Sequence, residues 1–304
     1  MESFRVHILG CGSALPTLKH YASSQVVELR DKLFMIDCGE GTQMQLRRSR
    51  LRFTKLNHVF ISHLHGDHCF GLIGMVSSFG MLGRTAPLHV YATAEFGDML
   101  RREIDFFCSG LEFEVVFHPI DTTQTSVIYD DRSLTVTTLP LKHRIPCCGF
   151  LFREKPTLPH IRRELIDMYG IPLSQINNIK NGQSWTTPDG EVIAAEQLTV
   201  PAAPARSYAY CSDTAYLPQL YKKLMGVSTL YHESTYTEAN AERARIYHHS
   251  TARQAAMVAK KAGAGQLILG HFSARYENEN ELLEEAKKTF DNVRLANEME
   301  VFDV

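Results

Sequence analysis

The chain has 304 residues, of which 44% are hydrophobic and 22% are charged, so it lies in the ordinary globular range and can enclose a sizeable core. The formal net charge of −2 argues against a generic nucleic-acid binder, which is usually basic overall, although charge can still be concentrated locally. No apolar run approaches the roughly 18 residues of a membrane span, which excludes the membrane-spanning class.

The start of the chain and its cysteines indicate the cellular compartment. The segment MESFRVHILGCG has an acid at Glu2 and only a short apolar stretch, unlike a signal peptide. The seven cysteines are an odd number with no CxxC pair, so neither a disulfide framework nor a cysteine-type zinc site is indicated. We expect a cytoplasmic protein without membrane association, in which the cysteines are small core residues.

The first 120 residues alternate strand and helix signals. Apolar or alternating runs predict strands at FRVHILGCG, SSQVVELR, KLFMIDCGEG, NHVFISH and LHVYA. Helical signals lie between them at residues 42–50, 69–80 and 95–107. This mixed order predicts an α/β sandwich.

Further strands are predicted in the second half, at SLTVTTLPL, GFLF, SYAYCSD, STLYHE and QLILGH. Each begins or ends near a His or Asp, and strand ends are where α/β layers expose side chains to a shared cleft. The acidic stretch that starts at Glu277 predicts a solvated amphipathic helix.

Residues 152–206 differ in character from the rest, because six prolines fall in this stretch. It contains one helical pattern over residues 159–169, closed by Gly170, and a hairpin-like turn at residues 188–190. We interpret it as an arm inserted into a single domain of residues 1–304. An ordinary surface excursion is the alternative.

The segment VFISHLHGDHCFG places His63, His65, Asp67 and His68 within six positions after a predicted strand. Burying such groups is costly unless something compensates them, and a metal ion does so. His63 and His65 are two apart in an extended loop and can point to one side, while Asp67 and His68 fall in the following turn. This geometry suits two metals better than one, and the nitrogen and oxygen ligands favour zinc, with manganese or iron as alternatives.

Two metal sites need more ligands than this segment supplies, and three residues at other strand ends fit: His143, Asp213 and His271. Most other histidines have a simpler interpretation. His7, His58, His89 and His118 lie in or beside strands and are expected to be structural, while His20 and His160 are expected at surface or arm positions.

The HLHGDH spacing, with its three downstream ligands, resembles the metallo-β-lactamase superfamily in its two-metal hydrolase form. Within it the chain is similar to the ribonuclease Z family over nearly its whole length, through the segments LGCGSALP, IDCGEGTQMQLRR, FISHLHGDHCFGL, YHESTY, YHHSTARQAA and LILGHFSARY. The resemblance implies a four-layer αββα sandwich with a protruding arm. It also implies a zinc-dependent endoribonuclease that removes the 3′ trailer from precursor tRNA and leaves a 3′-hydroxyl.

The resemblance further implies a site with two Zn²⁺ ions per subunit, or Mn²⁺ in their place. One ion is held by His63, His65 and His143, the other by Asp67, His68 and His271, and Asp213 bridges both.

Three catalytic roles follow from the same resemblance. Asp67 orients or deprotonates the water, and His249, backed by Glu233, protonates the leaving oxygen. His249 is preferred over His248 because Thr251 and Gln254 match a capping box, which fixes His249 just before a helix. The alternative for Glu233 is a strand-end salt bridge.

Substrate contacts are predicted at a basic run with five bases in nine residues: Arg47, Arg48, Arg50, Arg52 and Lys55. It is a candidate contact for the tRNA acceptor stem, or else a solvated helix face. In the family the arm clamps the tRNA elbow and homodimers are typical, with the arm of one subunit serving the other. Here residues 153–190 carry five bases against four acids, and of the family's Gly and Pro rich motif only residues 170–172 remain.

Two departures from the family pattern affect recognition and the metal site. Residues 16–21 read PTLKHY, where the family has Lys, Arg and Asn positions after the proline, and Ser212 replaces the Gly before the bridging Asp. Two other functions stay open. One is a hydrolase of the same superfamily acting on a small phosphodiester, and the other is an RNA-binding scaffold that has lost activity, against which the filled ligand positions argue.

Overall fold

The computed structural model describes residues 3–304. Within them the chain divides into two compact units. The larger comprises residues 3–131, 135–152 and 206–304, and the smaller comprises residues 132–134 and 153–205. None of the helices found in residues 3–304 has both the length and the apolar character needed to cross a lipid bilayer.

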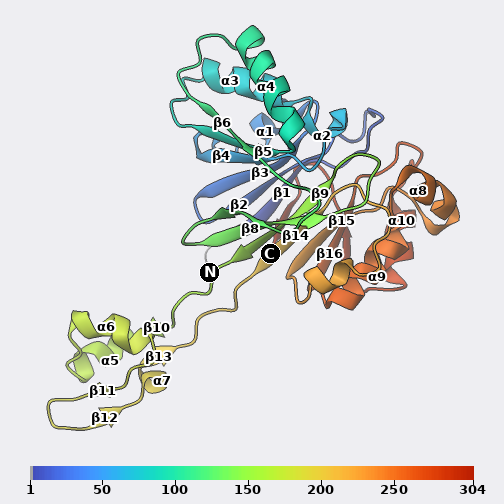
Figure 1. Cartoon of the computed structure of the whole chain (residues 1–304). Coiled ribbons are helices and arrows are strands. Elements are labelled where there is room, and N and C mark those ends of the chain that lie inside the picture. Colours follow the sequence, from blue (N-terminus) through green and yellow to red (C-terminus); the bar gives the residue numbers. More distant parts are fainter. Residues whose placement is uncertain (1–2) are drawn as a thin grey trace. The chain divides into compact units, whose positions relative to one another are not determined.

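Two seven-stranded sheets form the larger unit (Figure 1). The first sheet has the strand order β18 (Val301–Asp303), β1 (Phe4–Gly10), β2 (Ser24–Leu29), β3 (Lys32–Cys38), β4 (Leu56–Phe60), β5 (Leu88–Ala92) and β6 (Val115–Pro119). Its strands are antiparallel from β18 to β3 and parallel from β3 to β6.

The second sheet has the strand order β17 (Val293–Leu295), β16 (Gln266–Gly270), β15 (Thr229–Glu233), β14 (Ser207–Cys211), β9 (Cys148–Glu154), β8 (Leu134–Pro140) and β7 (Val127–Asp130). The four strands from β14 to β17 run parallel. Their carboxyl ends therefore lie at one edge of the sheet.

Aromatic side chains join the two sheets. Phe34 of β3 and Phe60 of β4 contact Phe152 of β9, with ring centroids 5.9 and 5.7 Å apart, and Phe60 also contacts Phe150 at 5.5 Å. These four rings are fully buried, so the space between the sheets is an apolar core.

Helices cover the outer face of each sheet (Figure 1). Beside the first sheet lie α1 (Thr42–Arg48), α2 (Gly66–Cys69), α3 (Leu72–Met81) and α4 (Ala94–Phe107). Beside the second lie α8 (Ala241–Tyr247), α9 (Ala252–Ala262) and α10 (Asn280–Lys287). Short 3-10 helices occur at Phe53–Lys55, Leu220–Lys223 and Glu238–Asn240. The predicted four-layer αββα sandwich is confirmed.

The helix predicted over residues 69–80 is wrong in one respect, because the structure has two helices, α2 and α3, with a break at Phe70 and Gly71. Gly71 donates its backbone N–H to the carbonyl of Cys38 at 2.8 Å, and a Cβ at this position would meet the oxygen of Gly39 at 2.1 Å. The close approach to β3 requires glycine and turns the chain. The apolar pattern carries no sign of this contact, which comes from a distant segment.

The smaller unit has its own small core, formed by Ile171, Ile179, Ile193, Ala195 and Leu198. Its elements are β10 (His160–Ile161), α5 (Arg163–Met168), α6 (Leu173–Lys180), β11 (Trp185–Thr186), β12 (Val192–Ile193), α7 (Ala195–Leu198) and β13 (Thr199–Val200). The predicted hairpin turn is present between β11 and β12, with Gly190 at φ 86°.

The helical pattern predicted over residues 159–169 is wrong at its start. His160 and Ile161 form β10, which pairs antiparallel with Val200 and Thr199 of β13. The helix α5 spans only Arg163–Met168, and the predicted Gly170 follows shortly after its end with a φ of 60°. Pairing with a strand some 40 residues away outweighs the local helical preference.

Candidate metal centre

Strand ends carry the predicted metal ligands. His63 and His65 follow β4, Asp67 and His68 lie in the short helix α2, and His143 follows β8. Asp213 and His271 follow the parallel strands β14 and β16, which lie on either side of β15. Because loops from both sheets meet at this edge, seven side chains that span some two hundred residues converge on one site.

The first cluster consists of His63, His65, His143 and Asp213, whose ligand atoms all lie within 4.8 Å of one another. His65 Nδ1 is 3.1 Å from His63 Nε2 and 3.2 Å from His143 Nε2. Asp213 Oδ2 is 3.7 Å from His63 Nε2 and 3.6 Å from His143 Nε2. Three imidazole nitrogens and one carboxylate oxygen therefore surround a common point.

The second cluster consists of Asp67, His68 and His271. Asp67 Oδ2 lies 3.4 Å from the Nε2 atoms of both histidines. The other oxygen of Asp213, Oδ1, lies 3.4 Å from His68 Nε2 and 3.1 Å from His271 Nε2. Asp213 thus presents one oxygen to each cluster, which is the arrangement of a bridging carboxylate.

The donor atoms fit divalent cations. His68 Nε2 and Asp213 Oδ1 are buried and have no hydrogen-bond partner within residues 3–304, and unsatisfied buried polar atoms are costly. Burial lowers the pKa of His63 well below its ordinary value and that of His143 to about 4, so both rings are neutral and offer lone pairs. Nitrogen and oxygen ligands without thiolate suit zinc or manganese.

The carboxylates at the site are ionised. Burial alone raises the pKa of Asp213, but the neighbouring His271, His68 and His63 outweigh it and hold the pKa well below the ordinary value. The pKa of Asp67 is lowered in the same way, against burial, by His68 and His271. Burial lowers the pKa of His68, but Asp213, Asp37 and Asp67 outweigh it and hold this pKa well above the ordinary value, so a cation bound at His68 Nε2 would replace the proton that the ring carries.

Asp37 supports the site, although the sequence analysis missed it. This buried strand residue has φ 56° and accepts hydrogen bonds from Ser62 N at 2.7 Å and Tyr210 Oη at 2.7 Å. Its Oδ2 lies 2.7 Å from His68 Nδ1, which leaves Nε2 of His68 facing the site. The available signal was a lone acid inside the apolar run FMID.

Glu233 and His249 form a pair next to the two clusters. Glu233 ends β15 with no exposed surface, and its Oε1 lies 2.9 Å from His249 Nδ1. The carboxylate also accepts from the backbone N–H groups of Thr214, Thr235 and Ser250, each at 3.0 Å. It is therefore held by a buried network, unlike an exposed strand-end salt bridge.

His249 sits on a fixed chain segment. The predicted capping box is present, because the Thr251 side chain accepts from Gln254 N and the Gln254 side chain accepts from Thr251 N. Burial lowers the pKa of His249, but the charge and hydrogen bond of Glu233 outweigh this and raise it to about 9. His249 Nδ1 is 3.9 Å from Asp213 Oδ2, so the ring adjoins the metal clusters.

His248 contributes through its backbone. It ends α8 with φ 58°, and its carbonyl oxygen accepts a hydrogen bond from His143 Nδ1 at 3.0 Å. The His248 residue itself is half-buried. Ser212 does not have a positive φ, and its hydroxyl bonds that of Ser62 at 2.8 Å, so the replacement of Gly leaves the chain path undisturbed.

A pocket of about 330 Å³ opens onto the site, and its lining includes His65, Asp67, Asp213, His249 and His271. Sequence reasoning missed its other polar lining residues, namely Arg144, Arg243, Arg275, Tyr236, Tyr247, Ser13 and Ser273. None of the predicted basic run lines this pocket. In that run Arg48 donates to Tyr21 Oη at 2.9 Å, and Lys55 pairs with Asp31 at 2.5 Å.

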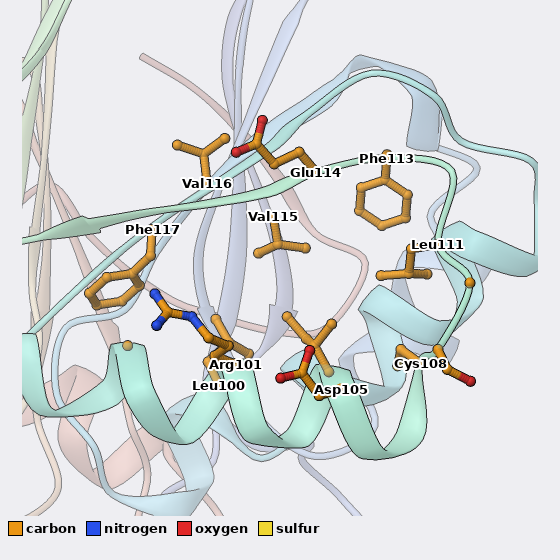
Figure 2. A pocket seen from close by; sticks show the side chains of 14 residues that line it. Leu100, Arg101, Asp105, Cys108, Leu111, Phe113, Glu114, Val115, Val116 and Phe117 are labelled. Carbon is orange, nitrogen blue, oxygen red and sulfur yellow. The ribbon is translucent and has the colours of Figure 1, made fainter.

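A larger cavity of about 620 Å³ lies between α4 and the segment leading into β6. Figure 2 shows its mixed lining, in which apolar side chains such as Leu100, Phe113 and Phe117 alternate with the charged side chains of Arg101, Asp105 and Glu114. None of the seven converging side chains lines it. The chemistry belongs to the smaller pocket.

The remaining histidines mostly lie as expected. His58, His89 and His118 are half-buried in neighbouring strands, and His89 Nδ1 lies 2.9 Å from His118 Nε2. His160 is exposed in the smaller unit. The prediction for His20 is wrong, because this ring is only 8% exposed and is bound by two distant glutamates. All seven cysteines are buried and free, as predicted.

Comparisons with known proteins agree with this geometry. A ribonuclease Z of Bacteroides fragilis is 59% identical over 298 residues, covering 98% of each chain, and one of Porphyromonas gingivalis is 48% identical over the same coverage. The crystal structure of human tRNase Z, short form, superimposes with a TM-score of 0.71 at 25% identity, covering 98% of each chain. The metallo-β-lactamase-fold protein YhfI of Bacillus subtilis has a TM-score of 0.68 at 18% identity, over the full length of both chains. The family described as "Anti-Pycsar protein Apyc1" matches residues 4–157.

Proposed function

The chain belongs to the ribonuclease Z family and is an endoribonuclease of tRNA 3′ processing, and we propose that its seven converging side chains hold two zinc ions per subunit, with manganese as an alternative. The observation that carries this proposal is the position of Asp213, with one oxygen facing each cluster. We further propose a cytoplasmic location, where precursor tRNA is processed.

The two other functions considered from the sequence have less support. A small-molecule hydrolase does not explain why relatives named ribonuclease Z match 98% of this chain, including Glu233 and His249. An inactive scaffold does not account for a full set of converging ligands and a buried Glu233–His249 pair.

Cations held by these ligands supply water activation at neutral pH and neutralise charge on the phosphoryl oxygens. Asp67 orients the attacking water, because His68 and His271 fix its carboxylate beside the pocket. As water attacks phosphorus, the bond between phosphorus and the 3′ oxygen breaks, and His249 delivers a proton to that oxygen. The tRNA thus gains a 3′-hydroxyl, and the phosphate stays on the trailer.

Glu233 is proposed to orient His249 for this transfer. A carboxylate only accepts hydrogen bonds, so the ring nitrogen Nδ1 must carry a proton toward Glu233. The proton that leaves is then the one on Nε2, on the opposite side of the ring.

The function is tested by incubating the zinc-loaded protein with a precursor tRNA that carries a 3′ trailer. We expect a single cut after the discriminator base, with a 3′-hydroxyl on the tRNA fragment. A matched precursor with a disrupted acceptor stem serves as the control substrate. Failure to cut the intact precursor with both metals bound would reject the nuclease function, and good turnover of a small chromogenic phosphodiester alone would favour the small-molecule hydrolase.

We propose that the pocket arginines grip the RNA phosphates next to the cut. Among residues 3–304, no acidic side chain forms an ion pair with Arg144, Arg243 or Arg275. Arg144 lies over the Tyr247 ring at 6.0 Å and Arg275 over the Tyr236 ring at 5.3 Å. Unpaired guanidinium groups beside a cation site create the positive potential that a polyanion needs, although the whole chain carries a net charge of −2.

Replacing both Arg144 and Arg243 by alanine is expected to raise KM for precursor tRNA and to flatten its salt dependence. Each lost phosphate contact removes about 0.7 to 0.9 from the slope of log K against log salt. KM is measured between low and physiological salt. Arg245→Ala is the matched control, because Arg245 lies on α8 with Arg243 but already pairs with Glu242 at 2.6 Å. An unchanged slope in the double variant would contradict the assignment.

We propose that the smaller unit binds the tRNA elbow and that the enzyme works as a homodimer whose arms act in trans. A mixing experiment tests this. A chain with residues 155–204 replaced by a short Gly and Ser linker is mixed with the full-length His249→Ala chain, and the two are allowed to exchange subunits. We expect mixed dimers to recover cleavage because one arm and one complete site meet, whereas each variant alone is inactive. Absence of recovery in verified mixed dimers would rule out action in trans.

A further inference from the structure

A second network of ionisable side chains surrounds His20, in the loop between β1 and β2. His20 Nδ1 lies 2.9 Å from Glu298 Oε2, and His20 Nε2 lies 3.2 Å from Glu279 Oε1. Lys19 pairs with the other oxygen of Glu279 and donates to the backbone carbonyl of Glu277 at 3.2 Å. One imidazole therefore links two glutamates that lie about 260 and 280 residues further along the chain.

Both ring nitrogens of His20 face carboxylate oxygens, which only accept hydrogen bonds, so both nitrogens must carry protons. Burial lowers the pKa of His20, but the hydrogen bonds and charges of Glu298 and Glu279 outweigh it and raise the pKa above its ordinary value. With His20 and Lys19 protonated, two positive charges balance the two glutamates. The ring is thus held as a buried imidazolium.

A metal ion is the competing interpretation, since Cys11, His20 and Glu298 have ligand atoms close together. The contacts favour a proton instead. The Cys11 thiol donates to the carbonyl of Ala296 at 3.4 Å, and burial together with Glu298 raises its pKa well above the ordinary value. A thiol held in this form is a poor metal ligand. In contrast to the main clusters, no atom of this group lacks a partner within residues 3–304.

The network joins the loop to the pocket wall. Glu298 Oε1 accepts from Tyr21 N at 2.8 Å, and Gly12 N donates to the Tyr21 carbonyl at 2.9 Å. Phe272, the residue after the predicted ligand His271, donates its N–H to the Cys11 carbonyl at 2.9 Å, and its ring contacts that of His20 at 5.6 Å. Ser13 in turn donates to the Phe272 carbonyl at 3.1 Å.

The residues that follow Gly12 line the catalytic pocket, since Ser13, Ala14 and Leu15 belong to its wall. Leu15 is 68% exposed, so this part of the wall is open to solvent. The buried network binds one end of the loop at Tyr21 N, and the Tyr21 carbonyl in turn accepts from Gly12 N at the other end. Its conformation is therefore coupled to the protonation of one side chain.

We propose that His20 is a positioning residue for substrate binding: its imidazolium, bracketed by Glu279 and Glu298, holds residues 13–21 as a wall of the catalytic pocket for the RNA next to the cut. This inference rests on the proposed function of that pocket. It assigns a role to residues 16–21, where this chain departs from the family pattern. It also makes the affinity for RNA dependent on pH.

The direction of the pH effect follows from the raised pKa. Such a group contributes fully below the ordinary histidine value of about 6.5, and the contribution is lost as pH rises through the folded-state pKa. The charged and titratable groups that face His20 are Glu279, Glu298, Lys19 and Cys11. When His20 loses its proton, the charge on Lys19 alone balances the carboxylates of Glu279 and Glu298.

The test compares wild type with His20→Gln, which can donate only from its amide and carries no charge. We expect KM for precursor tRNA to rise about tenfold at pH 7, as for loss of a charge-assisted hydrogen bond, while kcat changes by less than about threefold. The wild-type KM should approach that of the variant as pH rises, so that their ratio falls toward one. Turnover of a small chromogenic phosphodiester and metal content should stay at wild-type levels.

His7→Gln is the matched control, because His7 also pairs with a glutamate, Glu28 at 3.0 Å, on the same sheet but outside this network. Glu298→Gln should raise KM as His20→Gln does, and the double variant should show less than the sum of the two effects. A KM ratio that is independent of pH, or additive effects, would overturn the positioning role.

A measurement that needs no activity separates this inference from the proposed function. In protein labelled with ¹⁵N-histidine, both ring nitrogens of His20 should be protonated at pH 7, and backbone amides of residues 17–21 should exchange faster in His20→Gln. A neutral His20 tautomer at pH 7 would overturn the inference. A protein with the protonated ring that cuts no precursor tRNA would instead reject the proposed function.

Discussion

Replacing Asp213 by alanine is expected to empty both cation sites and to lower cleavage of precursor tRNA by on the order of 10⁴-fold or more. A bound cation would lower the pKa of a water molecule from about 15.7 to about 7, and this activation is lost when the sites are empty. Asp213 Oδ2 faces His63 and His143, and Oδ1 faces His68 and His271. Asp213 belongs to the first cluster, and its second oxygen faces both histidines of the second cluster. Losing this one carboxylate therefore affects two sites at once.

Elemental analysis of purified protein checks the prediction. We expect about two metal ions per chain in the wild type and fewer than one in Asp213→Ala, at zinc concentrations that saturate the wild type. Asp105→Ala is the matched control, since Asp105 is an exposed acid that lines only the larger cavity. A variant that keeps two ions and cuts within about tenfold of wild type would contradict the bridging role.

The metal content of a variant at a ligand of one cluster can be compared with that of Asp213→Ala. His143 faces only the first cluster, so His143→Ala is expected to lose one ion and retain the other. If Asp213→Ala and His143→Ala lose the same single ion, Asp213 serves the first site alone.

The convergence of the seven candidate ligands could be predicted because most of its signals are local. The HLHGDH spacing puts four ligands in one loop, and the other three follow predicted strands. The carboxyl ends of parallel strands meet at one edge of a sheet, which accounts for Asp213 and His271 in the second sheet. The approach of the HLHGDH ligands from the first sheet depends on how the two sheets pack. The capping box before α9 likewise depends only on Thr251 and Gln254, which are three residues apart.

The residues that were missed or misplaced depend on distant partners. His20 reads as a surface residue beside Lys19, and only Glu279 and Glu298, far along the chain, make it a buried ion. Arg144, Arg243 and Arg275 are single cations in three separate segments, which form a cluster only in the folded pocket. The contiguous run from Arg47 to Lys55 was the more visible signal, and it does not line that pocket.

Replacing His249 by alanine is expected to lower kcat for precursor tRNA by about 10²- to 10⁴-fold, the usual loss of a general acid, with both metal ions retained. The ring is held by Glu233 at 2.9 Å, and the predicted ligand sets of both clusters are complete without it. Glu233→Gln should cause a smaller loss, because His249 remains but is less well oriented.

His248→Asn is the matched control for the neighbouring histidine. The backbone of His248 has φ 58°, which asparagine tolerates better than most residues, so the carbonyl that accepts from His143 keeps its position. We expect kcat within a few-fold of wild type. A loss as large as that of His249→Ala would mean that the whole segment, and not the His249 ring, carries the effect.

The choice of leaving group separates proton donation from other roles of His249. The 3′ oxygen of a ribose leaves as a strongly basic alkoxide unless it is protonated, whereas a nitrophenolate leaves without help. His249→Ala should therefore retain most of its turnover of a nitrophenyl phosphodiester while losing that of precursor tRNA. If the turnover of both substrates fell equally, His249 would be acting on the cations or on the attacking water. The approach of His249 Nδ1 to Asp213 Oδ2, at 3.9 Å, would then be the contact that explains the loss.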